Sequence, residues 1–397
     1  MTLQMAERIR SFGTTIFTEM NTLALEHNAV NLSQGMPDFA GPEFAKIAAI
    51  NAIRTDQNQY APVPGIVALR KAIANTYARD YGLEANPLTE VTVTCGASEA
   101  IFDVIMAMVN PGDEVIVFEP AYDAYIADII MAGGTPRFVT LRPPANAAAN
   151  QREASWTFDV AELRASFNSK TRAILVNTPH NPTGKVFSME ELQDIAALCR
   201  EHDVLVIADE VYDRLIFKGK HISIATLPGM WERTVTVNSA GKSFTVTGWK
   251  IGYAIAPAPL TEALRRVHQF VNFAIATPLQ AAVAEALEEA ARSNHYDELC
   301  EFYAVRRTLL IDILNNAGMI VAPHEGTYFL MADVRPWGFS DDVSFCRHLT
   351  MNVGVAAIPP SAFYADPRQA PIMARFCFAK DLTTLRAAAD KLVACRV

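Results

Sequence analysis

The sequence lacks the long apolar run of a membrane span and the paired cysteines of a metal or disulfide site. Its longest apolar segments, such as 101–109, fall well short of the roughly 18 residues that a membrane helix needs. None of the cysteines forms a Cys-x-x-Cys pair; they are Cys95, Cys199, Cys300, Cys346, Cys377 and Cys395. We therefore expect no membrane contact, no metal, and cysteines that are reduced core thiols.

Strong charge of one sign is also lacking. The net charge is −9 and no run of like charges occurs, whereas a nucleic-acid surface needs a basic patch. The first residues, MTLQMAERIRSFGTT, contain no apolar core of signal-peptide length. We expect a cytoplasmic protein that binds no nucleic acid.

The chain has 397 residues, which suits two domains, and half of them are apolar. Short apolar runs recur through its middle, many rich in valine and isoleucine, as in strands buried on both faces. Between them lie helical patterns such as 188–202, where Ser188 and Glu191 have the spacing of a capping box. This alternation predicts an α/β fold with a mostly parallel central sheet. The predicted strands are 91–94, 114–118, 137–141, 172–177, 204–209, 234–238 and 253–256.

The pattern changes after Pro278, where two helical stretches lead to short strands. The helices are expected at 279–290 and 295–317, and the strands near 327–333, 353–358 and 373–378. This order indicates a smaller α+β domain. We predict a large domain at 41–284, a small domain formed by 1–40 and 285–397, and a surface connection at 142–156.

Ligand sites of open α/β sheets lie at the carboxyl ends of the strands, so residues that follow strands are the first candidates. The small residues 96–98 stand between a strand and a helix, which suits a phosphate, although a plain tight turn has the same pattern. Asn181 lies in the loop NTPHNPTG, where it either faces a ligand or forms an Asx turn.

Two charged residues also follow buried strands. Asp209 comes directly after the apolar run 204–207, so it either faces a cation or caps a helix. Lys242 lies among small residues, where desolvation would lower its pKa and make it an amine nucleophile; a surface loop is the alternative.

Together these residues match the needs of pyridoxal 5′-phosphate (PLP). This cofactor requires an amine for its Schiff base, an anion beside its ring nitrogen and a cradle for its phosphate. Lys242, Asp209 and the turn at 96–98 supply the three.

The chain resembles the fold-type I, class I/II PLP-dependent aminotransferases along nearly its whole length. The matching motifs are NLSQGMPDF, NQYAPVPG, NTPHNPTGK, ADEVY, SAGKSFTVTGWKIGY and ARFCFA. Within this family, GTTIFTEM and EGTYFL most resemble the methionine and the kynurenine/glutamine aminotransferases.

The resemblance implies a role for each matching residue. Lys242 would form the Schiff base, Asp209 would pair with the ring nitrogen, and Tyr212 and Asn181 would bond the ring oxygen. Tyr122 would stack on the ring. The phosphate would be held by Ala97, Ser98, Ser239 and Lys250, and by Tyr60 of a neighbouring subunit, which implies a homodimer with shared sites.

For the substrate, the resemblance implies that Arg375 binds the α-carboxylate, with Gly35 and Asn181 beside it. Ile16 and Phe17 would line the side-chain pocket. Two positions depart from many relatives: alanine stands at 97 in place of a second glycine, and lysine at 250 in place of arginine. Lysine keeps the charge but binds as a point donor.

We therefore expect transfer of an amino group from a neutral, apolar or aromatic L-amino acid, with methionine the leading candidate, to a 2-oxo acid. Kynurenine/glutamine aminotransfer and β-elimination from cysteine conjugates remain as alternatives, because Lys242 and Asp209 serve aminotransfer and β-elimination alike. A PLP-binding transcription regulator is a further alternative, but no basic helix-turn-helix segment precedes residue 12.

Overall fold

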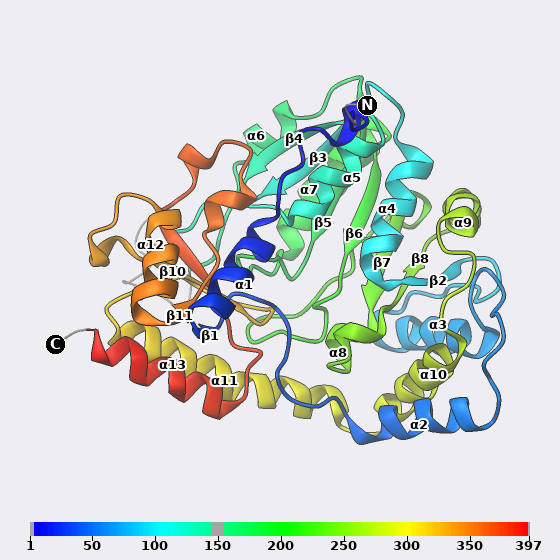
Figure 1. Ribbon diagram of the computed structural model, residues 1–397. Helices are drawn as coiled ribbons and strands as arrows, with labels where there is room; N and C mark the ends of the chain where they lie inside the picture. Colours follow the sequence, from blue (N-terminus) through cyan, green and yellow to red (C-terminus); the bar gives the residue numbers. More distant parts are fainter. Residues whose placement is uncertain (1–3, 145–153, 396–397) are drawn as a thin grey trace.

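The structure, a computed structural model, describes residues 4–144 and 154–395. Its centre is a seven-stranded sheet in the order β2-β8-β7-β6-β5-β3-β4 (Figure 1). Only β8 runs antiparallel to its neighbours, which confirms the mostly parallel sheet. The strands are β2 (Val91–Cys95), β3 (Glu114–Glu119), β4 (Thr135–Thr140), β5 (Thr171–Asn177), β6 (Leu205–Asp209), β7 (Thr234–Ser239) and β8 (Ile251–Ile255).

Helices cover both faces of this sheet, so the inner strands are buried on both sides. Along β3, Ile116 and Phe118 pack into one apolar cluster, whereas Val115 and Val117 pack into another. Strand β4 departs from the prediction for 137–141: it is an edge strand whose residues are exposed or partly buried except for Val139, which is buried. The covering helices are α4 (Gly96–Met108), α5 (Asp123–Met131) and α9 (Ala258–Val271) on one face, and α6 (Val160–Ala165) and α7 (Met189–His202) on the other.

The predicted capping box at the start of α7 is confirmed. The Ser188 hydroxyl accepts a hydrogen bond from the Glu191 N–H at 3.2 Å, and the Glu191 carboxylate accepts one from the Ser188 N–H at 2.8 Å. Both amides would otherwise lack partners, so this pair fixes where the helix begins.

The two ends of the chain meet in a second layer. Strand β1 (Val30–Asn31) pairs in parallel with β11 (Val355–Ala356), and an antiparallel sheet has the order β12-β10-β9. These strands are β9 (Ile320–Val321), β10 (Phe329–Asp333) and β12 (Met373–Cys377). Around them lie α1 (Ile16–Glu26), α11 (His295–Asn316), α12 (Asp342–His348) and α13 (Leu382–Ala394), with α11 and α13 side by side (Figure 1).

Three helices pack together beside β2, namely α2 (Glu43–Arg54), α3 (Val67–Tyr81) and α10 (Thr277–Arg292).

The helices and strands expected after residue 278 are confirmed by α10, α11, β10, β11 and β12. The domain boundaries, 41–284 for the large domain and 1–40 with 285–397 for the small one, stay a prediction.

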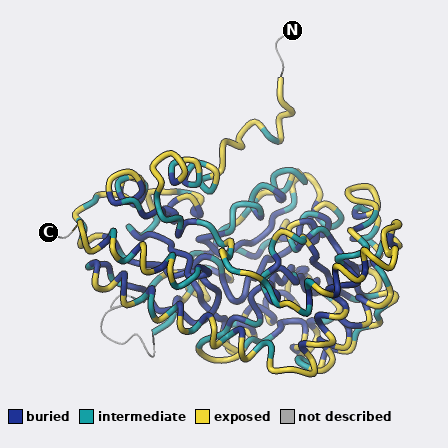
Figure 2. The backbone as a smooth tube through the Cα atoms, turned by 60° about the horizontal axis from the view of Figure 1, so that its bottom comes forward, coloured by how far each residue is buried: buried dark blue, intermediate teal, exposed yellow. Residues whose placement is uncertain are grey.

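Two segments outside these layers remain. Residues 4–15 before α1 are almost wholly exposed (Figure 2). Residues 7–9 of this segment contact α5, and residues 11–15 line a hollow beside that helix. Arg142, the first residue of the predicted surface connection at 142–156, forms a β-bridge with Thr157, which follows it. Trp156, the last residue of the connection, is buried, and residues 145–153 lie outside the described chain. No helix within 4–144 or 154–395 combines the length and apolar character needed to cross a bilayer.

Candidate active site

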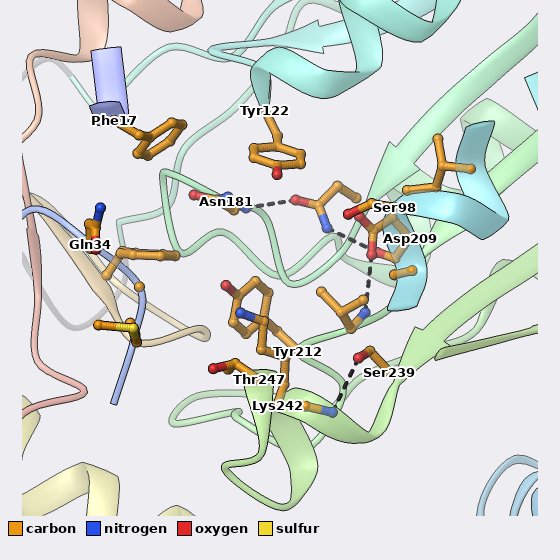
Figure 3. Close-up of a pocket in the computed structure, with 18 of the residues that line it drawn as sticks. Phe17, Gln34, Ser98, Tyr122, Asn181, Asp209, Tyr212, Ser239, Lys242 and Thr247 are labelled. Carbon is orange, nitrogen blue, oxygen red and sulfur yellow. Dashed lines mark hydrogen bonds between the residues drawn. The ribbon is translucent and has the colours of Figure 1, made fainter. Parts of the chain in front are cut away.

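A cavity of about 440 Å³ opens where the carboxyl ends of β5, β6 and β7 face the second layer. Figure 3 shows Phe17 and Tyr122 on one side of it, with Tyr212, Lys242 and Ser239 on the other. The structure brings most of the predicted site residues together around it. They are Phe17, Gly35, Ala97, Ser98, Tyr122, Asn181, Asp209, Tyr212, Ser239, Lys242, Lys250 and Arg375.

Lys242 lies in α8 (Ala240–Ser243), a single helical turn that follows β7. Its ammonium donates a hydrogen bond to the Tyr328 hydroxyl at 2.6 Å, and that hydroxyl donates to the Gly35 carbonyl at 2.6 Å. Protein surrounds the side chain except toward the cavity, and this desolvation lowers the pKa of Lys242 to about 8. A neutral amine is therefore accessible near physiological pH.

Asp209 ends β6 and is buried. The Tyr125 hydroxyl donates to one carboxylate oxygen, and the Val211 N–H donates to the other at 3.2 Å. Burial raises the pKa of Asp209 to about 6, although both hydrogen bonds favour the anion. A buried anion at the cavity wall favours the binding of a cationic group beside it.

The amino end of α4 forms a cradle for an anion. Gly96 has a φ of +74°, a left-handed conformation that favours glycine, and the Lys250 ammonium lies against it. Ala97 and Ser98 follow in the first turn, where backbone N–H groups lack helical partners. Lys250, the free amides and the Ser98 and Ser239 hydroxyls make this end of the cavity electropositive, as a phosphate requires.

Arg375 also lines the cavity and is 1% exposed. Its guanidinium donates to the Ser33 carbonyl at 2.8 Å and to the Asn181 side chain at 3.1 Å. Its Nε has no hydrogen-bond partner in the described chain, and burial lowers the pKa of Arg375 to about 10. Such a cation needs a further anionic partner.

Aromatic rings surround this guanidinium. It lies 4.0 Å from the ring centre of Phe329, 5.1 Å from that of Phe17 and 5.4 Å from that of Phe363. These rings exclude water from the charge and give the neighbouring wall an apolar surface.

Sequence reasoning missed two tyrosines that hold the charged groups in place. Tyr328 bonds Lys242, and Tyr125 bonds Asp209. Signals for both were present, because Tyr328 lies in the EGTYFL motif and Tyr125 follows Tyr122 at helical i+3 spacing. Asn177, which donates to the Asp209 carbonyl at 3.0 Å, was also missed.

Two predicted site residues lie outside the cavity. Ile16 lines an adjoining, more open hollow of about 860 Å³, on the other side of Phe17 and Tyr122. Tyr60 is 84% exposed and makes an edge-on ring contact with Phe273 at 5.4 Å. Within one chain Tyr60 does not reach the site, so its role in a neighbouring subunit stays a prediction.

Comparison with known proteins agrees with this geometry. Residues 27–392 match the family described as aminotransferase class I and II. The chain is 42% identical to a methionine aminotransferase of Escherichia coli (strain K12), over 97% of each chain. It is also 42% identical to a kynurenine–oxoglutarate transaminase of Dictyostelium discoideum, over 99% of this chain and 96% of that one.

Solved structures show the same fold. A crystal structure of an Escherichia coli methionine aminotransferase superposes with a TM-score of 0.91 at 41% identity, over 98% of this chain and 99% of that one. An N-succinyldiaminopimelate aminotransferase from Mycobacterium tuberculosis gives 0.93 at 41% identity, over 98% and 100% of the two chains. The chain has the fold-type I architecture and belongs to the class I and II aminotransferases, so it is a transaminase.

Proposed function

We propose that this transaminase uses PLP to move the α-amino group of a neutral, apolar or aromatic L-amino acid, methionine foremost, to a 2-oxo acid. The observation that carries the proposal is Lys242, a half-buried amine whose pKa is lowered to about 8. It shares one cavity with the buried carboxylate of Asp209 and the anion cradle of α4.

The chemistry of the cavity fits PLP. The cradle formed by Ala97, Ser98, Ser239 and Lys250 would take the phosphate, and Lys242 would hold the cofactor covalently. Asp209 would face the ring nitrogen and favour its protonated form. Tyr122, Asn181 and Tyr212 line the space between, where they would contact the ring and its oxygen.

When bound, PLP supplies an electron sink that stabilises negative charge at the substrate Cα. Lys242 would act as the base, its Nζ accepting the proton from that carbon. The hydrogen bond from Nζ to the Tyr328 hydroxyl holds the amine against one wall of the cavity. Since Tyr328 is fixed by Gly35, this orientation is set before substrate arrives.

Arg375 would bind the substrate α-carboxylate through its unused donor and its fork of N–H groups. The surrounding rings of Phe17, Phe329 and Phe363 keep that pair dry and thus strong. With the carboxylate fixed, the Cα–H bond can be directed at Lys242.

The side-chain pocket supports neutral substrates. Among the described residues that line the cavity and the adjoining hollow, Arg375 is the only arginine. A second carboxylate would therefore lack a guanidinium partner. The names of the relatives, methionine aminotransferase and kynurenine–oxoglutarate transaminase, support apolar or aromatic donors. Kynurenine or glutamine transfer and a cysteine-conjugate β-lyase activity remain the alternatives.

We further propose a cytoplasmic homodimer in which Tyr60 reaches the cofactor phosphate of the neighbouring subunit. The exposed aromatic side chains of Tyr60, Phe270 and Phe273 support this arrangement, since clustered exposed apolar groups mark contact surfaces.

Replacing Lys242 tests the covalent role. Lys242→Ala should lower turnover by about 10³-fold or more, because both the attachment point and the base are lost. Lys242→Arg, which keeps the charge but has no usable amine, should be as inactive. Steady-state assays with methionine and a 2-oxo acid measure both, and full turnover in either variant would refute the assignment.

Replacing Arg375 tests the carboxylate site. Arg375→Ala should raise KM for amino acids by about 100-fold, since one charge-assisted pair is lost, while PLP still binds. Arg375→Lys should fall between this variant and the wild type. An unchanged KM in Arg375→Ala would place the carboxylate elsewhere.

Half-reactions with single amino acids test the substrate class. Methionine, phenylalanine and tyrosine should convert the bound cofactor at least about tenfold faster than aspartate does. The change in the visible absorbance of the cofactor measures each rate. Pyruvate and ammonia released from a cysteine S-conjugate, without amino transfer to any 2-oxo acid, would favour the lyase instead.

A further inference from the structure

A buried cluster of ionisable groups lies directly behind the anion cradle. Glu99 and Asp103 come from the first turns of α4, and His268 comes from α9. His268 and Asp103 have no exposed surface, and Glu99 is 8% exposed. None of the three lines the active-site cavity, so the proposed chemistry does not use them directly.

Glu99 holds the turn that leads into α4. Its carboxylate accepts a hydrogen bond from the N–H of Cys95, the residue that precedes the helix, and another from the Asn272 side chain at 3.2 Å. The bond to Cys95 fixes the backbone immediately before the cradle residues. However, an anion in this first turn also opposes the binding of a phosphate.

His268 offsets that charge. Its Nδ1 lies 2.9 Å from Glu99 and 3.4 Å from Asp103, and its Nε2 lies 2.9 Å from the Val63 carbonyl oxygen. A carbonyl can only accept, so Nε2 carries a hydrogen, and Nδ1 carries another because it faces two carboxylates. The ring is therefore an imidazolium.

The surrounding charges maintain this state. Burial alone lowers the pKa of His268, but the neighbouring carboxylates of Asp103 and Glu99 outweigh this effect and raise the pKa to about 9. Burial raises the pKa of Asp103 to about 6, and burial together with Asp103 raises that of Asp128 on α5 to about 7. At neutral pH the imidazolium therefore persists, and it faces the carboxylates of both Glu99 and Asp103.

We propose that His268 is a positioning residue for the phosphate-binding turn. Its positive charge offsets that of Glu99, the nearer of the two carboxylates, so Glu99 can hold the Cys95 amide while repelling the phosphate less. Its second N–H joins the turn to Val63, in the segment that also carries Tyr60. This inference rests on the proposed function, because it assumes that the cradle binds the phosphate of PLP.

A charge-compensation experiment on the apoprotein tests it. His268→Gln can still reach Val63 but leaves Glu99 unbalanced, and it should raise the Kd for PLP by about tenfold or more. The double variant Glu99→Gln with His268→Gln removes both charges and should return to within about threefold of the wild type. Gln269→Ala, an exposed change on the same helix, should leave the Kd unaltered.

Glu99→Gln alone provides a second test that does not depend on the stability of the histidine variant. It retains an acceptor for Cys95 and removes the repelling charge, so it should bind PLP, and inorganic phosphate in competition, at least as tightly as the wild type. Weakening in Glu99→Gln, or no recovery in the double variant, would show a merely structural role and overturn the proposal.

The remaining outcomes separate this inference from the function on which it rests. Wild-type apoprotein that fails to bind PLP would refute the proposed function. Tight binding by wild type and by His268→Gln alike would refute only the role of His268. A metal ion that copurifies with the wild type and is absent from all three cluster variants would also overturn it, since the three side chains offer ligand atoms within 4.8 Å of one another.

Discussion

The architecture of the site depends on keeping one amine partly dry while an anion stays ionised in the same cavity. Asp209 ends β6 and Lys242 follows β7, and these two strands are adjacent and parallel. The sheet itself therefore sets the separation of the two groups. Burial pushes both toward their neutral forms, lowering the pKa of the lysine to about 8 and raising that of the aspartate to about 6. A hydrogen bond to Tyr328 holds the side chain of Lys242, and a hydrogen bond from Tyr125 holds that of Asp209.

The second layer contributes the remaining residues of the site. Strand β12 contributes Arg375, β1 leads into the segment that carries Gly35, and Tyr328 directly precedes β10. Because these groups come from distant parts of the chain, the cavity forms only when both ends of the protein fold together. The cofactor cradle belongs to the sheet and the carboxylate site to the second layer, so cofactor and substrate are held by different parts of the fold.

Much of this could be predicted from local sequence. Strand-terminal residues such as Lys242, Asp209 and Asn181 were found because parallel strands place their carboxyl ends at one edge. The hydrogen bonds that Tyr125, Tyr328 and His268 make with Asp209, Lys242 and Glu99 could not be predicted in the same way, since each joins residues more than 80 positions apart. The site role of Tyr60 requires a second chain.

The central claim is a covalent bond between Lys242 and PLP, and borohydride reduction tests it most directly. The PLP-loaded wild type would be reduced, digested and mapped by mass spectrometry. The account predicts that the cofactor label lies on the one peptide that contains Lys242. A label on any other lysine, or no label, would contradict it.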